Sequence, residues 1–344
     1  MTLHTLPRLA AALAGAALLA GLAWAAATPS PAVPAGHARP APLAAQNLLL
    51  AGQQISAAAG PRLVAVGEYG HVLLSDDAGG TWRQARSVPT VTTLTALHFI
   101  DGQQGWAVGH GGVVIGTQDG GETWQPLAGR LDGPEVLLSV WFQDARHGMV
   151  VGAFGYAART ADGGRTWQTF AIAEGEEGER HLNQIFAGPG QGAERSLWVA
   201  AESGVLFRSG DAGATWQAVK LPYKGSIWGG TALADDSLLV WGMQGNALRS
   251  DDGGRTFTPV PTGTDQSLAG GVRLAGDGGV VLAGLGGAVV RSTDGGRSFG
   301  PLPRSDRAGV AAVLPGGAGR VQLLGQAGAQ AQPLAPAASA SAPR

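Results

Sequence analysis

The sequence predicts an all-β fold, a seven-bladed β-propeller with Asp-box repeats, and three observations lead to it. An eight-residue motif recurs six times between residues 75 and 299. Its Asp residues are separated by 42, 43, 49, 41 and 42 residues, and a steady period of this size indicates a repeat architecture. Each copy follows short apolar runs joined by a glycine turn, with almost no helical periodicity. Four short antiparallel strands per repeat form a propeller blade.

The repeated motif matches the Asp box, Ser/Thr-x-Asp-x-Gly-x-Thr-Trp/Phe. Its copies read SDDAGGTW, TQDGGETW, TADGGRTW, SGDAGATW, SDDGGRTF and STDGGRSF. The Asp carboxylate can accept hydrogen bonds from N–H groups of its own turn, and the aromatic residue can pack over the hairpin. We therefore interpret as structural the residues Asp77, Asp119, Asp162, Asp211, Asp252 and Asp294. Calcium binding is the alternative. Most copies offer one carboxylate and none carries the terminal Glu of an EF-hand loop, so we expect no metal site.

A second signature, a Gly-x-x-Gly turn or a close variant, lies about ten residues before each Asp. Glycine adopts the positive φ of such hairpin turns at no steric cost. A seventh unit, residues 309–334, keeps the strands and the turn but lacks the box. Because an open last blade would leave a strand edge unpaired, the ring should close. We expect residues 47–52, NLLLAG, to supply the outer strand of this last blade.

The two ends of the chain differ in composition from the repeats. Residues 1–27 contain Arg8, an apolar run and Ala-Trp-Ala before Ala26, the order of a secretory signal peptide. An uncleaved anchor is the alternative, since the run from Leu9 to Ala27 is long enough to span a bilayer. Residues 28–45 predict a Pro/Ala-rich linker and residues 335–344 a disordered tail. The propeller then spans residues 46–334, and we expect it in the periplasm or elsewhere outside the cytoplasmic membrane.

The composition excludes several classes of function. The formal net charge of −2 over 344 residues argues against a strongly basic nucleic-acid binder. The absence of Cys excludes disulfides, thiolate catalysis and cysteine metal sites. We expect a monomeric propeller with no small-molecule cofactor.

Function should lie in what differs between the blades. The turns between second and third strands, and the links between blades, should share the face opposite the Asp boxes. A ligand there could meet Glu68, Tyr69, His110, Phe154 and Glu202, unless these hairpin-tip side chains are simply solvated. The link AEGEEGER, residues 173–180, adds four Glu residues, which form either an acidic lip or a solvated loop.

Arginine immediately precedes the box in four consecutive blades, at Arg159, Arg208, Arg249 and Arg291. The first two blades have Leu74 and Gly116 there. Equivalent positions in successive blades lie on an arc, so the four guanidinium groups should form a partial ring suited to carboxylate-bearing partner segments. The alternative is that each Arg lies between blades and bonds neighbouring carbonyls.

The run GWAVGHGGVVIGTQDGGETW, Gly105 to Trp124, resembles the photosystem II stability/assembly factor family. The resemblance covers about residues 46–330. It implies an Asp-box propeller outside the membrane that assists insertion of a reaction-centre subunit in photosynthesis. For this chain it implies a non-catalytic scaffold that binds and stabilises a membrane protein or a subunit of a membrane complex. Related propellers occur in bacteria that do not photosynthesise, so another complex could be the partner. The family's arginine-rich patch cannot be matched here residue by residue.

Two other functions compete with the scaffold. Sialidases also carry Asp boxes, but their chemistry needs an arginine cluster, a Tyr nucleophile paired with Glu, and an Asp acid/base. Here Glu68 and Tyr69 are adjacent in sequence, which does not bring their side chains face to face, and the Arg-Ile-Pro segment of sialidases is absent. A glycan-binding propeller could use Trp106, Trp141, Trp198, Trp228 or Trp241, although strand Trp residues usually belong to the core.

Overall fold

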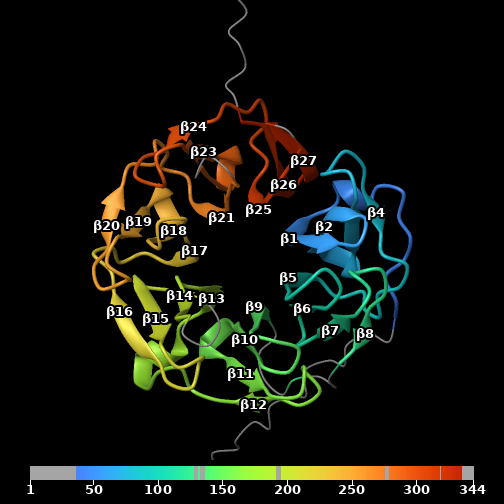
Figure 1. Ribbon diagram of the computed structural model, residues 1–344, viewed down its shortest axis with the longest axis horizontal. Helices are drawn as coiled ribbons and strands as arrows, with labels where there is room; N and C mark the ends of the chain where they lie inside the picture. The colour runs from blue at the N-terminus through green and yellow to red at the C-terminus, as the bar shows by residue number, and fades with distance from the viewer. Residues whose placement is uncertain are drawn as a thin grey trace, which may run out of the picture. The chain divides into compact units, whose positions relative to one another are not determined.

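The computed structural model describes residues 36–127, 131, 136–190, 195–275, 279–317 and 319–334. All of them belong to one compact unit, Ala32–Arg344. Within this unit seven antiparallel sheets follow one another around a ring in chain order, which confirms the predicted seven-bladed β-propeller (Figure 1). The predicted signal peptide, the first part of the linker and the predicted tail lie outside the described residues.

The first six blades each have four strands, which run from the centre of the ring outward in sequence order (Figure 1). Blades 1 and 2 comprise β1 Leu49–Ala57, β2 Gly60–Gly67, β3 Val72–Ser75, β4 Arg83–Gln84, β5 Leu94–Phe99, β6 Gly105–Gly109, β7 Val114–Thr117 and β8 Gln125–Pro126. Blades 3 and 4 comprise β9 Leu137–Phe142, β10 Gly148–Gly152, β11 Ala157–Thr160, β12 Gln168–Thr169, β13 Leu182–Ala187, β14 Leu197–Ala201, β15 Val205–Ser209 and β16 Gln217–Lys220. Blades 5 and 6 comprise β17 Ile227–Ala232, β18 Leu238–Gly242, β19 Ala247–Ser250, β20 Thr258–Val260, β21 Leu268–Arg273, β22 Val280–Gly284, β23 Val289–Ser292 and β24 Gly300–Pro301. Blade 7 has β25 Val310–Pro315, β26 Arg320–Gly325 and β27 Gly328–Pro333.

The second strand of each blade is largely buried, because neighbouring blades cover both of its faces. In β14, which reads LWVAA, every residue is buried. Such a continuous apolar run is typical of a strand with two covered faces. Trp106, Trp198 and Trp241, considered above for glycan binding, are each at most 2% exposed in these layers. The hydrophobic core is therefore divided into layers between neighbouring blades.

The prediction for residues 47–52 was wrong. Leu49 begins β1, the innermost strand of blade 1, which pairs with β2 from Leu49 opposite Gly67 to Ala57 opposite Gly60. The short turn after Ala57 keeps this run in the first sheet, and the described part of blade 7 has three strands. The ring closes by packing, since Leu314 and Leu324 of blade 7 share one core cluster with blade 1.

The turns fall into two groups on opposite faces. The Asp boxes lie beside the turns between first and second strands, as the bonds from Gly120 N to Gln103 O and from Gly163 N to Arg146 O show (each 2.9 Å). We call this side the box face. The turns between second and third strands bond instead to the links between blades, for example Gly155 N to Arg180 O (2.8 Å). We call that side the link face.

The helices among the described residues are short 3-10 turns, and none of them has the length and apolar character needed to cross a membrane. They are η1 Ala44–Gln46, η2 Glu68–Gly70, η3 Ala153–Gly155, η4 Gly175–Glu179, η6 Met243–Gly245 and η7 Leu285–Gly287. The end of the predicted linker packs on the propeller, because Ala38 N donates to Val88 O at 2.9 Å and η1 precedes β1 directly. Four of these turns, η2, η3, η6 and η7, join second to third strands on the link face.

Packing at the ring closure should carry much of the stability. Leu324 is fully buried between blades 7 and 1, so Leu324→Ala should lower the free energy of unfolding by about 3 kcal/mol. Leu43→Ala, at a side chain that is 60% exposed, should change it by less than about 0.5 kcal/mol. Urea unfolding followed by tryptophan fluorescence compares the two. Equal losses would show that the closure is not held by this cluster.

Candidate partner-binding surfaces

Each Asp box is held together by its own carboxylate. In blade 3, Asp162 accepts hydrogen bonds from Thr166 N–H (2.9 Å), from the Thr166 hydroxyl (2.6 Å) and from the Thr160 hydroxyl (2.8 Å). Bonds from the Thr four residues after the Asp lower the pKa of Asp77, Asp162 and Asp211 to about 2. These carboxylates are thus ionised and engaged in their own turns. Within the described ranges, no three His, Cys, Asp or Glu side chains are grouped to hold a metal ion.

The box turn also joins neighbouring blades. At four boxes the backbone carbonyl that follows the box Asp accepts a hydrogen bond from a side chain of the preceding blade. Four such pairs are Arg62 with Gly120 (3.1 Å), Trp106 with Gly163 (3.0 Å), Gln322 with Ala78 (3.1 Å) and Arg249 with Gly295. A carbonyl that is buried without a partner costs about 1–3 kcal/mol, so each donor stabilises a blade junction. We call this interaction the junction bond.

One position in the second strand decides which residue makes the junction bond. In blades 2 and 7 it holds Trp106 and Gln322, which stand three residues before the closing Gly of the strand and donate themselves. In blades 1 and 5 the same position holds Val64 and Leu239, which have no donor. An arginine on the same blade then makes the bond.

Two of the four predicted arginines belong to this framework. Arg249 is 2% exposed, and its guanidinium contacts Asp235 (2.5 Å) and Asp251 (2.7 Å) besides the Gly295 carbonyl. Arg291 Nη1 donates to the Leu334 carbonyl of the next blade at 3.0 Å. Bonding to neighbouring carbonyls between blades was the alternative considered for these residues, and it describes both of them.

The other two predicted arginines are exposed on the surface. The guanidinium carbon of Arg159 lies 5.7 Å from the centre of the Phe170 ring, and that of Arg208 lies 5.7 Å from the Trp198 ring. Arg159 lines a groove of about 390 Å³ between blades 3 and 4, together with Trp141 and Met149. In the part of the chain that the structure describes, neither arginine forms an ion pair. Both can therefore meet a partner.

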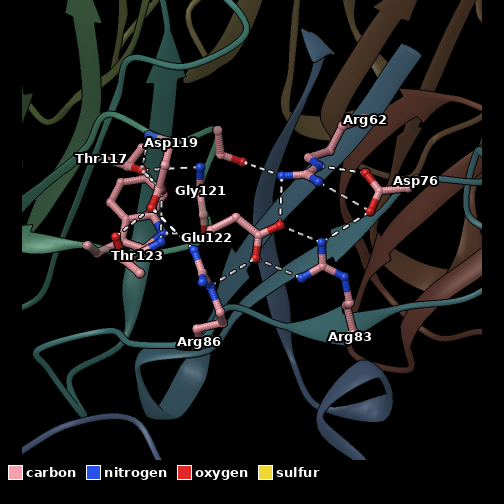
Figure 2. Close-up of polar contacts among 11 residues, drawn as sticks. Arg62, Asp76, Arg83, Arg86, Thr117, Asp119, Gly121, Glu122 and Thr123 are labelled. Carbon is pink, nitrogen blue, oxygen red and sulfur yellow. Dashed lines mark hydrogen bonds and ion pairs between the residues drawn. The ribbon is translucent and has the colours of Figure 1, made fainter. Parts of the chain in front are cut away.

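A charged network that the sequence did not predict joins blades 1 and 2. Figure 2 shows Arg62, Arg83 and Arg86 converging on Asp76 and Glu122. Arg62 lies 2.6 Å from Asp76 and 3.1 Å from Glu122, and Arg83 lies 2.6 Å from Glu122. Hydrogen bonds from Arg83 hold the pKa of Glu122 below its ordinary range. In the sequence, the network could have been suspected from two additional carboxylates in the boxes. They are Asp76 in SDDAGG and Glu122 in GGETW, and both stand at variable positions of the box.

The five residues expected on the link face do lie on its turns, and they divide into two groups. Glu68 accepts from Leu48 N at 3.0 Å and Glu202 accepts from His181 N at 3.0 Å, so both carboxylates fasten a turn to the adjoining link. Tyr69, His110 and Phe154 are exposed. Because the Glu68 carboxylate is bonded to backbone, it does not pair with Tyr69 as a sialidase mechanism requires.

The inner strands line a central channel and are tied to one another by polar side chains. Gln53 of β1 exchanges two hydrogen bonds with Phe99 of β5 (3.0 and 2.9 Å). His98 of β5 accepts from Phe142 N of β9 through Nδ1 at 3.1 Å. Burial lowers the pKa of His98 to about 4, so the ring is neutral at pH 7. The channel wall is therefore a satisfied polar network that holds successive blades together.

Comparison with known sequences gives a consistent picture. A family model described as "Photosynthesis system II assembly factor YCF48" matches residues 124–258. Photosystem II assembly protein Ycf48 of Thermosynechococcus vestitus is 42% identical over 43 residues, 12% of each chain. Photosystem II stability/assembly factor HCF136 of Cyanidioschyzon merolae is 44% identical over 52 residues, 14% of this chain and 12% of that protein. The matched stretches thus span about an eighth of these two relatives.

Comparison with solved structures extends the likeness to the whole propeller. A structure described as "YCF48 bound to D1 peptide" has a TM-score of 0.65 at 17% identity, covering 84% of this chain and 94% of that one. YCF48 from Cyanidioschyzon merolae has a TM-score of 0.64 at 17% identity, covering 86% of this chain and 98% of that one. Virginiamycin B lyase from Staphylococcus aureus has a TM-score of 0.67 at 13% identity, covering 83% of this chain and 94% of that one. At such identities the structures establish a shared fold. Together with the repeat sequence, they show that the chain resembles the YCF48 assembly factors.

A pair of variants separates the framework arginines from the exposed ones. Arg249→Met removes the donor to the Gly295 carbonyl and the buried guanidinium that pairs with two carboxylates, so it should lower the free energy of unfolding by about 2 kcal/mol. Arg208→Met removes an exposed group and should change it by less than about 0.5 kcal/mol. Chemical unfolding measures both. Equal stability of the two variants would contradict the framework role of Arg249.

His98 should make the fold sensitive to mild acid. Its pKa falls from an ordinary 6.5 to about 4, so its contribution is complete above about pH 6.5 and is lost as the pH falls toward 4. The loss should not exceed about 3 kcal/mol. His98→Asn, which offers an amide oxygen to Phe142 N–H but does not titrate, should lose less stability between pH 7 and pH 4.5 in urea unfolding. His71, whose pKa burial also lowers, titrates in both proteins. Identical pH profiles would contradict the assignment.

Proposed function

We propose that this protein is a non-catalytic scaffold that binds a carboxylate-bearing segment of a membrane protein or membrane complex and stabilises it during assembly. The observation that carries the proposal is the exposure of Arg159 and Arg208, which the framework leaves without an ion pair among the described residues. They occupy equivalent positions in blades 3 and 4, immediately before the box.

The groove beside Arg159 has the chemistry of a peptide site. A guanidinium group binds a carboxylate through two parallel N–H···O bonds, which fixes the orientation of the bound segment. Trp141 and Met149 supply apolar contact area in the same groove. The fold likeness to YCF48 bound to a D1 peptide supports a peptide segment as the partner. The Asp-box carboxylates accept hydrogen bonds within their own turns and the Glu68 carboxylate accepts from Leu48 N, so these groups have structural partners.

The proposal places the propeller outside the cytoplasmic membrane, as a monomer. Its support is the order of charged, apolar and small residues in the first 27 positions, which is that of an export signal. In that location the propeller meets the segments that a membrane protein exposes beyond the bilayer.

Charge reversal tests the two exposed arginines. Arg159→Glu combined with Arg208→Glu should abolish capture of membrane-complex subunits in a crosslinking pulldown, because two carboxylates would repel an acidic segment. The unfolding temperature should stay within about 2 °C of wild type, since both groups are exposed.

Arg255→Glu is the matched control. Arg255 is an exposed arginine of the blade 5 box, outside the groove, so its reversal should leave capture intact. Undiminished capture by the double variant would refute the proposed site. Loss of folding in the double variant would place these two arginines in the framework instead.

A further inference from the structure

The exposed apolar side chains of the propeller are concentrated on the link face. Among the described residues, five large apolar side chains are exposed: Leu43 (60%), Tyr69 (59%), Phe154 (78%), Met243 (37%) and Leu285 (45%). Four of them belong to η2, η3, η6 and η7, the turns between second and third strands of blades 1, 3, 5 and 6. Leu43 immediately precedes η1, whose last residues lie against the Gly328 turn of blade 7. None of the five lies in an Asp box.

The fold does not require these residues. Tyr69 and Phe154 adopt φ values of 58° and 54°, a left-handed conformation that costs least for glycine. In the same turn of blades 2 and 6 the position is Gly111 and Gly286, with φ of 65° and 62°. An aromatic residue there is strained, and its side chain gains little from burial because it points into solvent. Among the described residues, the ring that contacts Phe154 is that of His181, at 4.8 Å between centroids.

The arrangement of the tips fits a broad, flat partner. The blades that carry them are distributed around the ring (Figure 1), and the same kind of turn places each tip on the same face. The apolar side chains are thus separate points on a circle and do not line one groove. A peptide follows a groove, whereas a flat surface can contact all the points together.

The path of the chain points to the same surface. The described chain reaches β1 through η1, which lies beside the link-face turn of blade 7. The sequence that precedes it contains the run from Leu9 to Ala27, which is the longest apolar run of the protein. The described chain therefore enters the propeller beside the face that carries the exposed apolar tips.

We propose that the link face rests on a lipid bilayer, with Tyr69, Phe154, Met243 and Leu285 inserted at the level of the headgroups. Aromatic and long apolar side chains prefer this interfacial region, and binding there increases with the apolar area that is buried. The surface carries the acidic turn η4, with Glu176, Glu177 and Glu179, so it suits zwitterionic headgroups rather than anionic ones. In this orientation the box face is directed away from the bilayer. The inference is independent of the identity of any protein partner.

The absence of cysteine allows a direct test on the full chain. A nitroxide is attached to Leu285→Cys on the link face or to Gln118→Cys, an exposed position on the box face. With phosphatidylcholine vesicles, the ratio of collisions with oxygen to collisions with a water-soluble nickel complex should rise for the probe at 285 and stay unchanged for the probe at 118. This readout reports the depth of each face whether or not the N-terminal segment is present.

Substitution of the aromatic tips provides the second arm. Tyr69→Asn with Phe154→Asn should return the ratio at 285 toward its aqueous value, while the unfolding temperature stays equal or rises because Asn tolerates the left-handed conformation better. If the collision ratio of the probe at 285 kept its aqueous value in the presence of phosphatidylcholine vesicles, the proposal would be overturned. Insertion of the probe into phosphatidylglycerol vesicles but not into phosphatidylcholine vesicles would also contradict it. If the probe at 285 were shielded from the nickel complex only in native membranes, the face would bind a protein and the proposal would be wrong.

Discussion

The junction bond is the interaction on which the ring depends. A tight turn built around an Asp satisfies its own N–H groups, but it directs one backbone carbonyl toward the preceding blade, where water is excluded. A buried carbonyl needs a donor, and the donor must come from another repeat. Trp106, Arg62, Arg249 and Gln322 solve this problem at four junctions with three different residue types. The Asp box thus stabilises its own blade through the carboxylate and the ring through the carbonyl.

This requirement separates the framework from the surfaces that can act on a partner. Where the donor is an arginine, its charge is used inside the protein, as the contacts of Arg249 with two carboxylates show. At the boundary between blades 3 and 4 the second-strand residue is Met149, which has no donor, and Arg159 beside it remains exposed. The surface that we propose to bind a carboxylate therefore lies where the framework leaves its arginine exposed. The opposite face is distinguished by apolar tips rather than by charge.

The sequence predicted the regular part of this structure well and the junctions poorly. The six boxes and the glycine turns located the strands, because the chemistry of each turn is local and repeats at a fixed interval. The strand at residues 47–52 was assigned to the wrong blade, since the pattern of a strand does not say which of two neighbouring sheets it joins. Likewise, Arg249 and Arg159 both immediately precede an Asp box. What separates them is the pair of carboxylates beside Arg249, Asp235 and Asp251. Arg159 has Ala161 at the position of Asp251, and the approach of Asp235 from the turn between β17 and β18 becomes visible only in three dimensions.

The measurement that tests the junction bond most directly is native-state amide hydrogen exchange on wild type and Gln322→Leu. Leucine occupies the equivalent position in blade 5, at Leu239, so the variant keeps the shape of the side chain and removes only the donor to the Ala78 carbonyl. If this bond fastens blade 7 to blade 1, protection should fall on both sides of the closure, in β26 and in the first Asp box, while blades 3 to 5 remain protected. A loss confined to the residues next to position 322, or no loss, would contradict the account.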